Sequence, residues 1–453
     1  MVRRTTYQPD WRIDLGDAWA GNSVNCAIYR AEPGAFAGPA SLAVAYYDDT
    51  GSALVREILW PAGAADPRLG RLVGLPHVRP PTDGHDVMSM GCDSTGRLHV
   101  VYGAHASGPG CVSIDPDTWS ASSQKLDPET ADEVTYPHFV NDAQTRELLL
   151  IFRRGRHDAG AIYVQRWDAT RCTWTADAVA LLSGLSEPWT AGPYLNTPMV
   201  ERNGQMGLFC VWRLPKRATT GGAVVNAGLD YVRSTDAFRT LSTIDGIGLS
   251  LPVTPTNAPR VVAVPLAANL INQGSAALLP GGRPIAATYW NDEEGRPQYH
   301  LAWFDGRTWR VSQVSAFRSR FRLDGGGTLS LPHSRPRIVA DEAGRVGLLF
   351  RSDEVDGRLI LRVLTPPLYD LNSAFDYVLA DRKLGRYEPT LIQEAWTKGQ
   401  QIVLYLQACQ QTGEAMPFER HTEGAELSAW QLPQPRTWWG WLKPNQRAGT
   451  PRV

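Results

Sequence analysis

A short apolar segment that ends in an aromatic residue or an arginine recurs along this chain of 453 residues, and it constrains the fold more than any other feature. Each copy follows a turn containing Gly or Asp, and successive copies begin roughly 50 to 80 residues apart. The copies span Ser41–Tyr47, Arg97–Tyr102, Glu147–Arg153, Gln205–Arg213, Arg283–Trp290, Arg345–Arg351 and Gln400–Leu406. A strand unit repeated at such intervals is typical of four-stranded propeller blades.

A second pattern follows several copies and resembles a degenerate Asp-box turn. In such a turn an Asp side chain caps the turn and a Trp packs between blades. The pattern spans Trp167–Trp174, Ser234–Thr240 and Phe304–Trp309. Helical periodicity is almost absent, and Leu266–Ile271 is the one candidate. The sequence therefore predicts an all-β fold, a single seven-bladed β-propeller of four-stranded antiparallel blades. We expect it to span residues 1–435, closed by N- and C-terminal strands, with residues 436–453 as a Trp-, Pro- and Arg-rich tail.

Composition excludes several classes of partner. The formal charge of −1 gives no basic field, so nucleic acid is not expected to bind. No apolar run is long enough to span a membrane, and the first residues lack the apolar core of a signal peptide. The six cysteines show no metal-site spacing and are expected to be buried free thiols. The 16 Trp and 15 Tyr suit a sugar-binding, turn-rich β fold, which we expect to be a monomer.

Polar residues fall opposite one another at the open ends of three consecutive predicted hairpins. Residues on antiparallel strands face each other directly, so the centre of each turn fixes the partners. These centres are Thr95, the bond between Gln144 and Thr145, and the Asn203-Gly204 dipeptide, which favours a tight hairpin. The predicted pairs are His85 with His105, Tyr136 with Arg153, and Tyr194 with Arg213.

Two imidazoles, a phenol and a guanidinium at one rim suit proton transfer next to an anion. β-Elimination at a uronic acid needs a base at C5, an acid at O4 and a cation on the carboxylate. His85 and Tyr136 can share the base and acid roles, and the residues alone leave that assignment open. Tyr136 precedes Pro137 and is expected to be extended. His99 lies mid-strand and is expected to pack in the core.

Several of these segments resemble the BNR-4 type propellers, a grouping that includes the seven-bladed polysaccharide lyases known best as ulvan lyases. The matching motifs are Gly84-His85-Asp86, Thr135-Tyr136-Pro137, Phe152-Arg153 and Asn226 to Asp236. The resemblance implies that His85 and Tyr136 transfer protons and that Arg153 and His105 meet the uronate carboxylate. A loop one residue longer than expected leaves Arg154 as the alternative to Arg153. The candidate substrate-binding residues are Tyr194, Arg213, Asn226, Tyr231 and Arg154.

The implied function is a polysaccharide lyase acting on a glucuronate- or iduronate-containing polysaccharide. Two alternatives remain. One is a glycoside hydrolase, either sialidase-like, which needs three arginines on the carboxylate and a Tyr–Glu pair, or an ordinary glycosidase, which needs two facing carboxylates. The other is a carbohydrate-binding propeller without catalysis. The reaction requires no cofactor. A structural Ca²⁺ or Zn²⁺ is compatible with the fold, and His300, His333 and His421 are candidates to meet in space. Such an enzyme would act in the periplasm or outside the cell, although cytoplasmic residence or release with a phage is also compatible.

Overall fold

The computed structural model describes most of the chain and leaves a set of short segments and the C-terminal residues undescribed. The described residues are 3–21, 27–30, 41–60, 66–76, 81, 84, 86–126, 133–175, 178–186, 189–215, 224–324, 329–393, 395–396, 400–410 and 422–433. The predicted tail, His85, Cys26 and His421 lie outside them.

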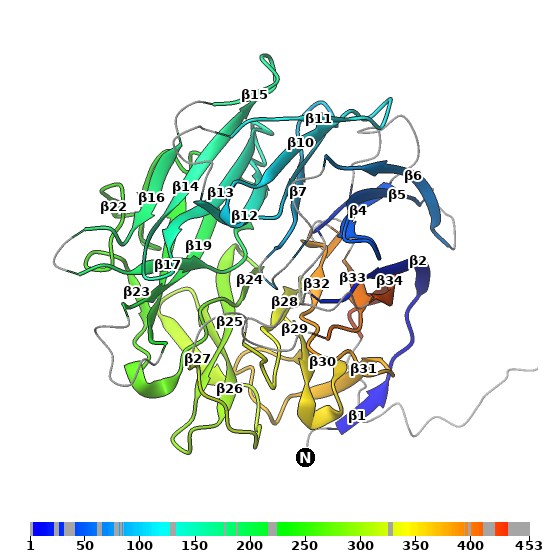
Figure 1. Ribbon diagram of the computed structural model, residues 1–453. Coiled ribbons are helices and arrows are strands. Elements are labelled where there is room, and N and C mark those ends of the chain that lie inside the picture. Colours follow the sequence, from blue (N-terminus) through cyan, green and yellow to red (C-terminus); the bar gives the residue numbers. More distant parts are fainter. Residues whose placement is uncertain are drawn as a thin grey trace, which may run out of the picture.

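Strands in the described part of the chain form seven sheets arranged around a common centre (Figure 1). The first sheet contains β3 (Ala27–Arg30), β4 (Ser41–Tyr47), β5 (Ala53–Leu59) and β6 (Arg68–Gly74). The second contains β7 (Ser89–Cys92), β8 (Leu98–Tyr102), β10 (Gly110–Ile114) and β11 (Ala121–Ser123). The third contains β9 (His105–Ser107), β12 (Val134–Asn141), β13 (Leu148–Arg156), β14 (Ala159–Asp168), β15 (Thr173–Trp174) and β16 (Val179–Ser183).

The remaining sheets follow in chain order around the ring. The fourth contains β17 (Gly192–Leu195), β18 (Met199–Val200), β19 (Met206–Arg213), β20 (Asn226–Ser234), β21 (Leu241–Ser242), β22 (Gly248–Leu249) and β23 (Arg260–Val262). The fifth contains β24 (Ser275–Leu279), β25 (Arg283–Asn291), β26 (Pro297–Phe304) and β27 (Trp309–Gln313). The sixth contains β28 (Arg337–Ala340), β29 (Val346–Ser352), β30 (Arg358–Leu364), β31 (Phe375–Ala380) and β1 (Arg3–Thr6). The seventh contains β32 (Thr390–Leu391), β33 (Gln401–Gln407), β34 (Thr422–Gln431) and β2 (Trp11–Trp19).

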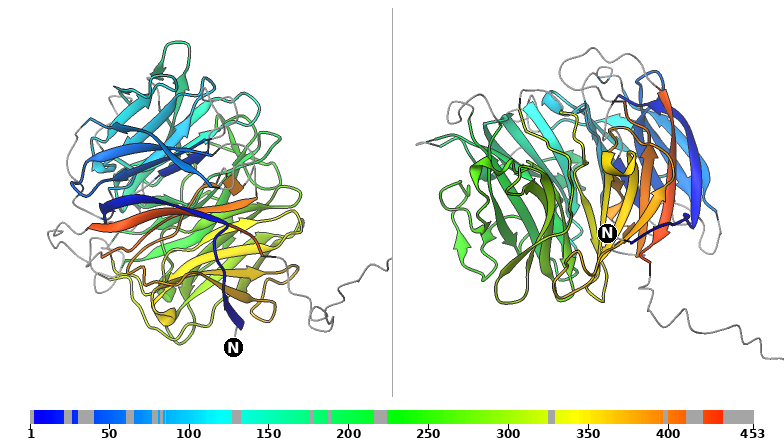
Figure 2. Two further views of the ribbon diagram at one scale, coloured as in Figure 1. Left: turned by 90° about the vertical axis from the view of Figure 1, so that its right-hand side faces the viewer. Right: turned by 90° about the horizontal axis from the view of Figure 1, so that it is seen from below.

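The predicted fold class, an all-β propeller built from small antiparallel sheets, is confirmed. Each repeated apolar segment forms an interior strand of one sheet, with a strand paired on either side; these strands are β4, β8, β13, β19, β25, β29 and β33. The two ends of the chain meet in the seventh sheet, where β2 pairs antiparallel with β34, as Figure 2 shows for the dark blue and red strands. The predicted domain boundary at residue 435 falls outside the described residues and stays a prediction.

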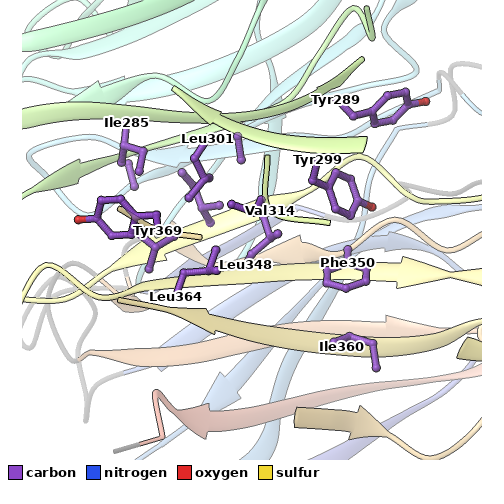
Figure 3. Packing of buried hydrophobic residues seen from close by; sticks show 14 of the residues in the cluster. Ile285, Tyr289, Tyr299, Leu301, Val314, Leu348, Phe350, Ile360, Leu364 and Tyr369 are labelled. Atoms are coloured by element: carbon purple, nitrogen blue, oxygen red, sulfur yellow. The ribbon is translucent and has the colours of Figure 1, made fainter. Parts of the chain in front are cut away.

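The repeated strands are apolar on both faces because each sheet is buried between two neighbours. Between the fifth and sixth sheets, Tyr299 and Leu301 lie in one cluster with Leu348 and Phe350 (Figure 3). All four are at most 1% exposed. Full burial of such a side chain contributes about 1.5–3 kcal/mol, so contacts between neighbouring sheets hold the ring together.

The predicted Asp-box turns are confirmed in the structure. In each turn one Asp Oδ1 accepts hydrogen bonds from backbone N–H groups two to four residues further on, at Asp168, Asp236 and Asp305. Trp174 is buried and packs with Trp167 against His99 of the second sheet. His99 is fully buried and lies 3.2 Å from Asp93, which agrees with its predicted place in the core.

Helical structure in the described residues is limited to short turns. The 3-10 helix η4 (Leu266–Ala268) falls within the segment predicted as a candidate helix, and η5 (Asp353–Val355) precedes β30. No helix in the described ranges is long and apolar enough to cross a bilayer. Cys111 and Cys210 are buried free thiols as predicted, whereas Cys172 is exposed in the turn before β15.

Three histidines, two of them buried and one half-buried, make the stability of the fold sensitive to acid. Burial lowers the pKa of His138, His300 and His333 from 6.5 to about 4 in each case. In the folded protein these rings therefore stay neutral below pH 6.5, whereas in the unfolded chain they take up protons. Their contribution to stability is complete above pH 6.5, declines as the pH falls, and levels off below about 4.

We expect the free energy of unfolding to fall as the pH drops from about 6.5 to about 4, with each histidine adding up to about 1.4 kcal/mol per pH unit. Urea unfolding at a series of pH values measures this slope. The variant His300→Gln should show a shallower slope. An equal slope in the variant and the wild type would contradict the assignment.

Candidate functional site

A cavity of about 1590 Å³ occupies the centre of the ring. It is lined by residues on or next to an innermost strand of every sheet: β3, β7, β12, β18, β24, β28 and β32. At one end lie the turns that lead from the first to the second strand of each sheet, such as Asp142–Arg146 and Gly281–Gly282. The starts of the innermost strands lie at the opposite end, which holds the predicted chemistry and which we call the site end.

Tyr136 enters the cavity from an irregular part of β12. The pairing of β12 with β13 shifts between Thr135 and His138, so Tyr136 and Pro137 lie in a bulge. The φ angle of Tyr136 is 53°, in the left-handed region that residues other than Gly rarely adopt. The extended backbone expected before Pro137 is therefore wrong. Strained backbone of this kind concentrates at functional sites, where it aims a particular side chain.

Arg153 and Arg213 lie against tyrosine rings at the site end. The central guanidinium carbon of Arg153 lies 5.1 Å from the ring centre of Tyr136 and 4.5 Å from that of Tyr194. The corresponding atom of Arg213 also lies 4.5 Å from the centre of the Tyr194 ring. These contacts are cation–π interactions, and they place two guanidinium groups and two phenols in one cluster.

Arg153 is only 4% exposed, yet it has unused hydrogen-bonding capacity. Its Nε and Nη1 atoms are buried and have no hydrogen-bond partner among the described residues. A buried cation without an anionic partner is costly unless a ligand compensates it. Arg154 instead points away from the cavity, half-exposed and 3.9 Å from Glu133. Of the two candidates, the structure places Arg153 in the cavity.

Two further arginines, Arg335 and Arg337, enter the cavity from the opposite side of the ring and were not identified from the sequence. Arg335 Nη1 lies 2.7 Å from Glu388 Oε1, and its Nη2 lies 3.4 Å from Asn272 Oδ1. Arg337 follows deeper in the channel, where its Nε donates to the carbonyl oxygen of Pro389. Among the described residues at the site end, Glu388 is the one carboxylate lining the cavity, against four arginines: Arg153, Arg213, Arg335 and Arg337.

This surplus of positive charge acts on the Tyr136 phenol. Burial raises the pKa of Tyr136 above its ordinary value of 10, and the nearby Tyr194 adds to the rise. Arg153, Arg335 and Arg213 oppose it without cancelling it. Tyr136 therefore keeps its proton at neutral pH and can donate it.

Histidines complete the site end. His105 lines the cavity and pairs in β9 with Thr135, directly before Tyr136. His138 lies deeper and is neutral because of its lowered pKa. His157 lines the cavity from the turn between β13 and β14, and burial lowers its pKa, with Arg213 and Arg153 contributing. Neutral imidazoles close to a protonated phenol can accept a proton.

The predicted cross-strand pairs differ from the observed ones. The first turn is centred at Thr95 as predicted, since Ser89 pairs with Val101. However, β8 ends at Tyr102, and His105 pairs with Thr135 in the third sheet instead of extending the hairpin of the second. His85 itself lies outside the described residues. In the second hairpin the predicted register holds from His138 to Asn141. The bulge then shifts it, so that Arg153 faces Thr135 instead of Tyr136.

In the third hairpin the prediction is off by two residues, because Arg213 faces Gly192 and Tyr194 faces Val211. Arg213 nevertheless reaches Tyr194 diagonally. Asn226 is 1% exposed and does not line the cavity. Its side chain accepts a hydrogen bond from Arg213 Nε at 3.2 Å and donates one to the Leu270 carbonyl, so it holds Arg213 in place.

Tyr231, predicted to bind substrate, is buried in the hydrophobic core. Its ring packs against Phe209 and Trp309, between the fourth and fifth sheets and away from the cavity. Along β20, alternate residues face opposite neighbours, which explains why a motif spanning this strand mixes core and site residues.

One signal in the sequence could have identified Arg335 and Glu388. A polar residue followed by proline stands at the start of several innermost strands: Tyr136-Pro137, Thr197-Pro198, Arg335-Pro336 and Glu388-Pro389. In each pair the residue before the proline lines the cavity. Proline lacks an N–H and suits the edge or first residue of a strand, so it marks the edge that faces the channel.

The described residues contain no group of three or more His, Cys, Asp or Glu side chains that could hold a metal ion. His300 stacks on Trp290 and His333 on Phe317, so these two candidates contact different aromatic rings. The suggestion of a structural Ca²⁺ or Zn²⁺ stays a prediction.

Comparisons with known proteins agree with this architecture. A solved structure of a "new family of Polysaccharide lyase PL25-Ulvanlyase" matches with a TM-score of 0.65 and 14% identity, covering 92% of this chain and 95% of that chain. Its complex with -[GlcA(1-4)Rha3S]- matches equally well. A protein of unknown function from Dyadobacter fermentans matches with a TM-score of 0.47 and 12% identity, covering 92% of this chain and 99% of that chain.

At identities this low, the structural likeness shows the fold alone. No sequence in the set of curated proteins matches the chain. The family model described as "BNR repeat-containing family member" matches residues 44–317, more than half of the sequence. The resemblance predicted from the sequence motifs is thus confirmed, and this chain belongs to the BNR repeat-containing family.

Proposed function

We propose that this protein is a polysaccharide lyase that cleaves a polymer containing uronic acid by β-elimination. The observation that carries the proposal is the cluster at the site end. There, Arg153 presents buried N–H groups that have no hydrogen-bond partner within the described part of the chain, next to Arg213 and to the protonated phenol of Tyr136. A cation for a carboxylate and an acid for a leaving oxygen are thereby close together.

In this proposal the uronate carboxylate lies on Arg153 and Arg213. Guanidinium groups stay protonated and can bind a carboxylate through two parallel hydrogen bonds. When the proton leaves C5, negative charge spreads onto the carboxylate. Cations already fixed at that place stabilise this charge without rearrangement. The excess of arginine over carboxylate around the site favours an acidic sugar as the ligand.

The proton transfers are assigned to a histidine and Tyr136. An imidazole takes the C5 proton, the C4–O4 bond breaks, a C4–C5 double bond forms, and O4 receives the proton of Tyr136. We assign the base role to His105 because its strand pairs with Thr135, directly before Tyr136, and because both side chains line the cavity. The raised pKa of Tyr136 supports its role as the acid, since a tyrosinate would be disfavoured.

The fold-level likeness to an ulvan lyase supports the same reaction class, and the ligand of that complex, -[GlcA(1-4)Rha3S]-, contains a uronate. A hydrolase with two catalytic carboxylates is less well supported. At the site end, the one carboxylate among the described lining residues is Glu388, and it is paired with Arg335.

The experiment that tests the function is digestion of a panel of glucuronate- and iduronate-containing polysaccharides. Elimination creates an unsaturated uronate that absorbs in the ultraviolet, so we expect absorbance to grow together with new reducing ends on at least one polymer. New reducing ends without the absorbance would show hydrolysis instead. Binding without any cleavage would leave only a carbohydrate-binding propeller.

A further inference from the structure

A second hollow, of about 500 Å³, lies beside the fifth sheet and apart from the central cavity. Trp290 at the end of β25 and His300 in β26 form one part of its wall, and Ala268 of η4 lies in another. The side chains of Asn291, Glu293 and Gln313 also line it. We call it the Trp290 cleft. Its volume falls within the range of small-molecule sites.

The indole of Trp290 is held in a fixed plane. Its ring is nearly parallel to the His300 ring, with 3.6 Å between ring centres and an angle of 4°. His300 is 6% exposed, whereas Trp290 is partly buried, packs against the core cluster between the fourth and fifth sheets, and lines the cleft with the rest of its ring. A rigid aromatic surface of this kind suits the apolar C–H face of a sugar ring, because little freedom is lost on binding.

The polar groups of the cleft suit hydroxyl groups. Gln313 Nε2 donates to the Ser315 carbonyl, and Asn291 Oδ1 pairs with Asn269. The groups left for a ligand are therefore Asn291 Nδ2 as a donor and Gln313 Oε1 and the Glu293 carboxylate as acceptors. Paired donors and acceptors next to an aromatic plane can bind neighbouring hydroxyls of one sugar. Leu266, at the outer end of η4, is 54% exposed and extends the apolar surface next to the cleft.

The charge of the cleft is opposite to that of the site end of the central cavity. Asp292 and Glu294 both pair with Arg296, at 2.8 and 2.6 Å, and Glu293 takes part in none of the ion pairs among the described residues. Three carboxylates therefore face one guanidinium. This local field disfavours a uronate and permits an uncharged sugar.

The cleft and the central site lie at the same end of the ring. The turn Asp292–Arg296 joins the second and third strands of the fifth sheet, as the turn with His157 does in the third sheet. Asn269 links the two places. Its Nδ2 lies 3.5 Å from Asn291 Oδ1 in the cleft, and its Oδ1 accepts a hydrogen bond from the N–H of Leu323, which lines the central cavity.

We propose that the Trp290 cleft binds an uncharged sugar residue of the polysaccharide whose acidic residue occupies the central cavity. This inference rests on the proposed function for the identity of the polymer. The cleft itself is an independent binding site for neutral sugars. A polymer that alternates acidic and neutral residues would engage both sites at once, and the second contact would strengthen binding of long chains over short ones.

Saturation-transfer NMR with cellobiose, lactose and xylobiose tests the cleft directly. We expect the wild type to transfer magnetisation to at least one of these disaccharides, Trp290→Ala to lose the transfer, and Trp290→Phe to retain part of it. Glucuronic acid, which should bind the central cavity, serves as the control and should give equal transfer in all three proteins. Absence of transfer in the wild type, or equal transfer in Trp290→Ala, would overturn the inference.

Kinetics on a polymer that the wild type cleaves separates this inference from the proposed function. Trp290→Ala should raise KM for the polymer roughly three- to tenfold, the loss expected for one aromatic contact, and leave kcat unchanged. If disaccharide binding depends on Trp290 while no polymer is cleaved, the sugar site at the cleft is supported and the proposed lyase function is contradicted. If the wild type and Trp290→Ala cleave the polymer with the same KM, the lyase function is supported and the proposal that the cleft binds the polymer is contradicted.

Discussion

Arg153→Ala is expected to lower kcat/KM on a uronate polymer by about 10²–10³-fold or more, because it removes a fixed cation at the place where charge develops. Arg153→Lys should recover only a small part of this loss, since lysine keeps the charge but cannot bind a carboxylate through a planar fork. Initial rates followed by ultraviolet absorbance of the product measure both effects.

The neighbouring residue provides a matched control. Arg154 is half-exposed and points toward Glu133, so Arg154→Ala should leave kcat/KM nearly unchanged. Thermal unfolding distinguishes a functional from a structural role for Arg153. Its Nε and Nη1 atoms have no hydrogen-bond partner among the described residues, so any fall in Tm on removing the side chain should be small and come from its lost contacts with the Tyr136 and Tyr194 rings. A marked fall in Tm with retained activity would contradict the assigned role.

Tyr136→Phe is expected to lower kcat by about 10²–10⁴-fold, the usual contribution of one positioned proton-transfer group, with little change in KM. The substitution removes a single hydroxyl and keeps the ring on which Arg153 packs. Tyr231→Phe is the control, because that phenol is buried in the core away from the cavity and should not affect kcat.

The pH dependence of the wild type tests whether Tyr136 acts as an acid. Since its pKa is raised above 10, the phenol is protonated throughout the neutral range. An acid role predicts that Tyr136 causes no rise in rate between neutral pH and pH 10. A rate that climbs tenfold per pH unit through this range, and loses that climb in Tyr136→Phe, would show that tyrosinate is the base instead.

The repeated strands could be predicted because a strand buried between two neighbouring sheets has apolar side chains on both faces. Glu147–Arg153 and Arg345–Arg351, for example, are apolar along most of their length. Turn centres near Thr95 and Gln144 were also recoverable. The register beyond the turns was not. The bulge at Tyr136 shifts the pairing of β12 with β13 by one residue, so that Arg153 faces Thr135. The composition of β12 does not indicate that a tyrosine before a proline adopts a left-handed φ.

The site was predicted in part for a related reason. His105, Tyr136, Arg153, Tyr194 and Arg213 all line the cavity, since hairpin geometry keeps residues at one height within reach even when the register slips. Arg335 and Glu388 were missed because they come from the sixth and seventh sheets, and only closure of the ring places them opposite Tyr136. The local sequence feature that could have identified Arg335 and Glu388 is a polar residue directly before the proline at the start of an innermost strand.

Digestion in water labelled with heavy oxygen tests the central claim most directly. Hydrolysis inserts one oxygen from water into each product pair, whereas elimination inserts none and leaves a double bond between C4 and C5. We predict products whose non-reducing ends are unsaturated, each lighter by one water than its hydrolytic counterpart and free of the label beyond the slow exchange that unlabelled reducing sugars show in the same water. Saturated products that carry the heavy oxygen would contradict the lyase assignment.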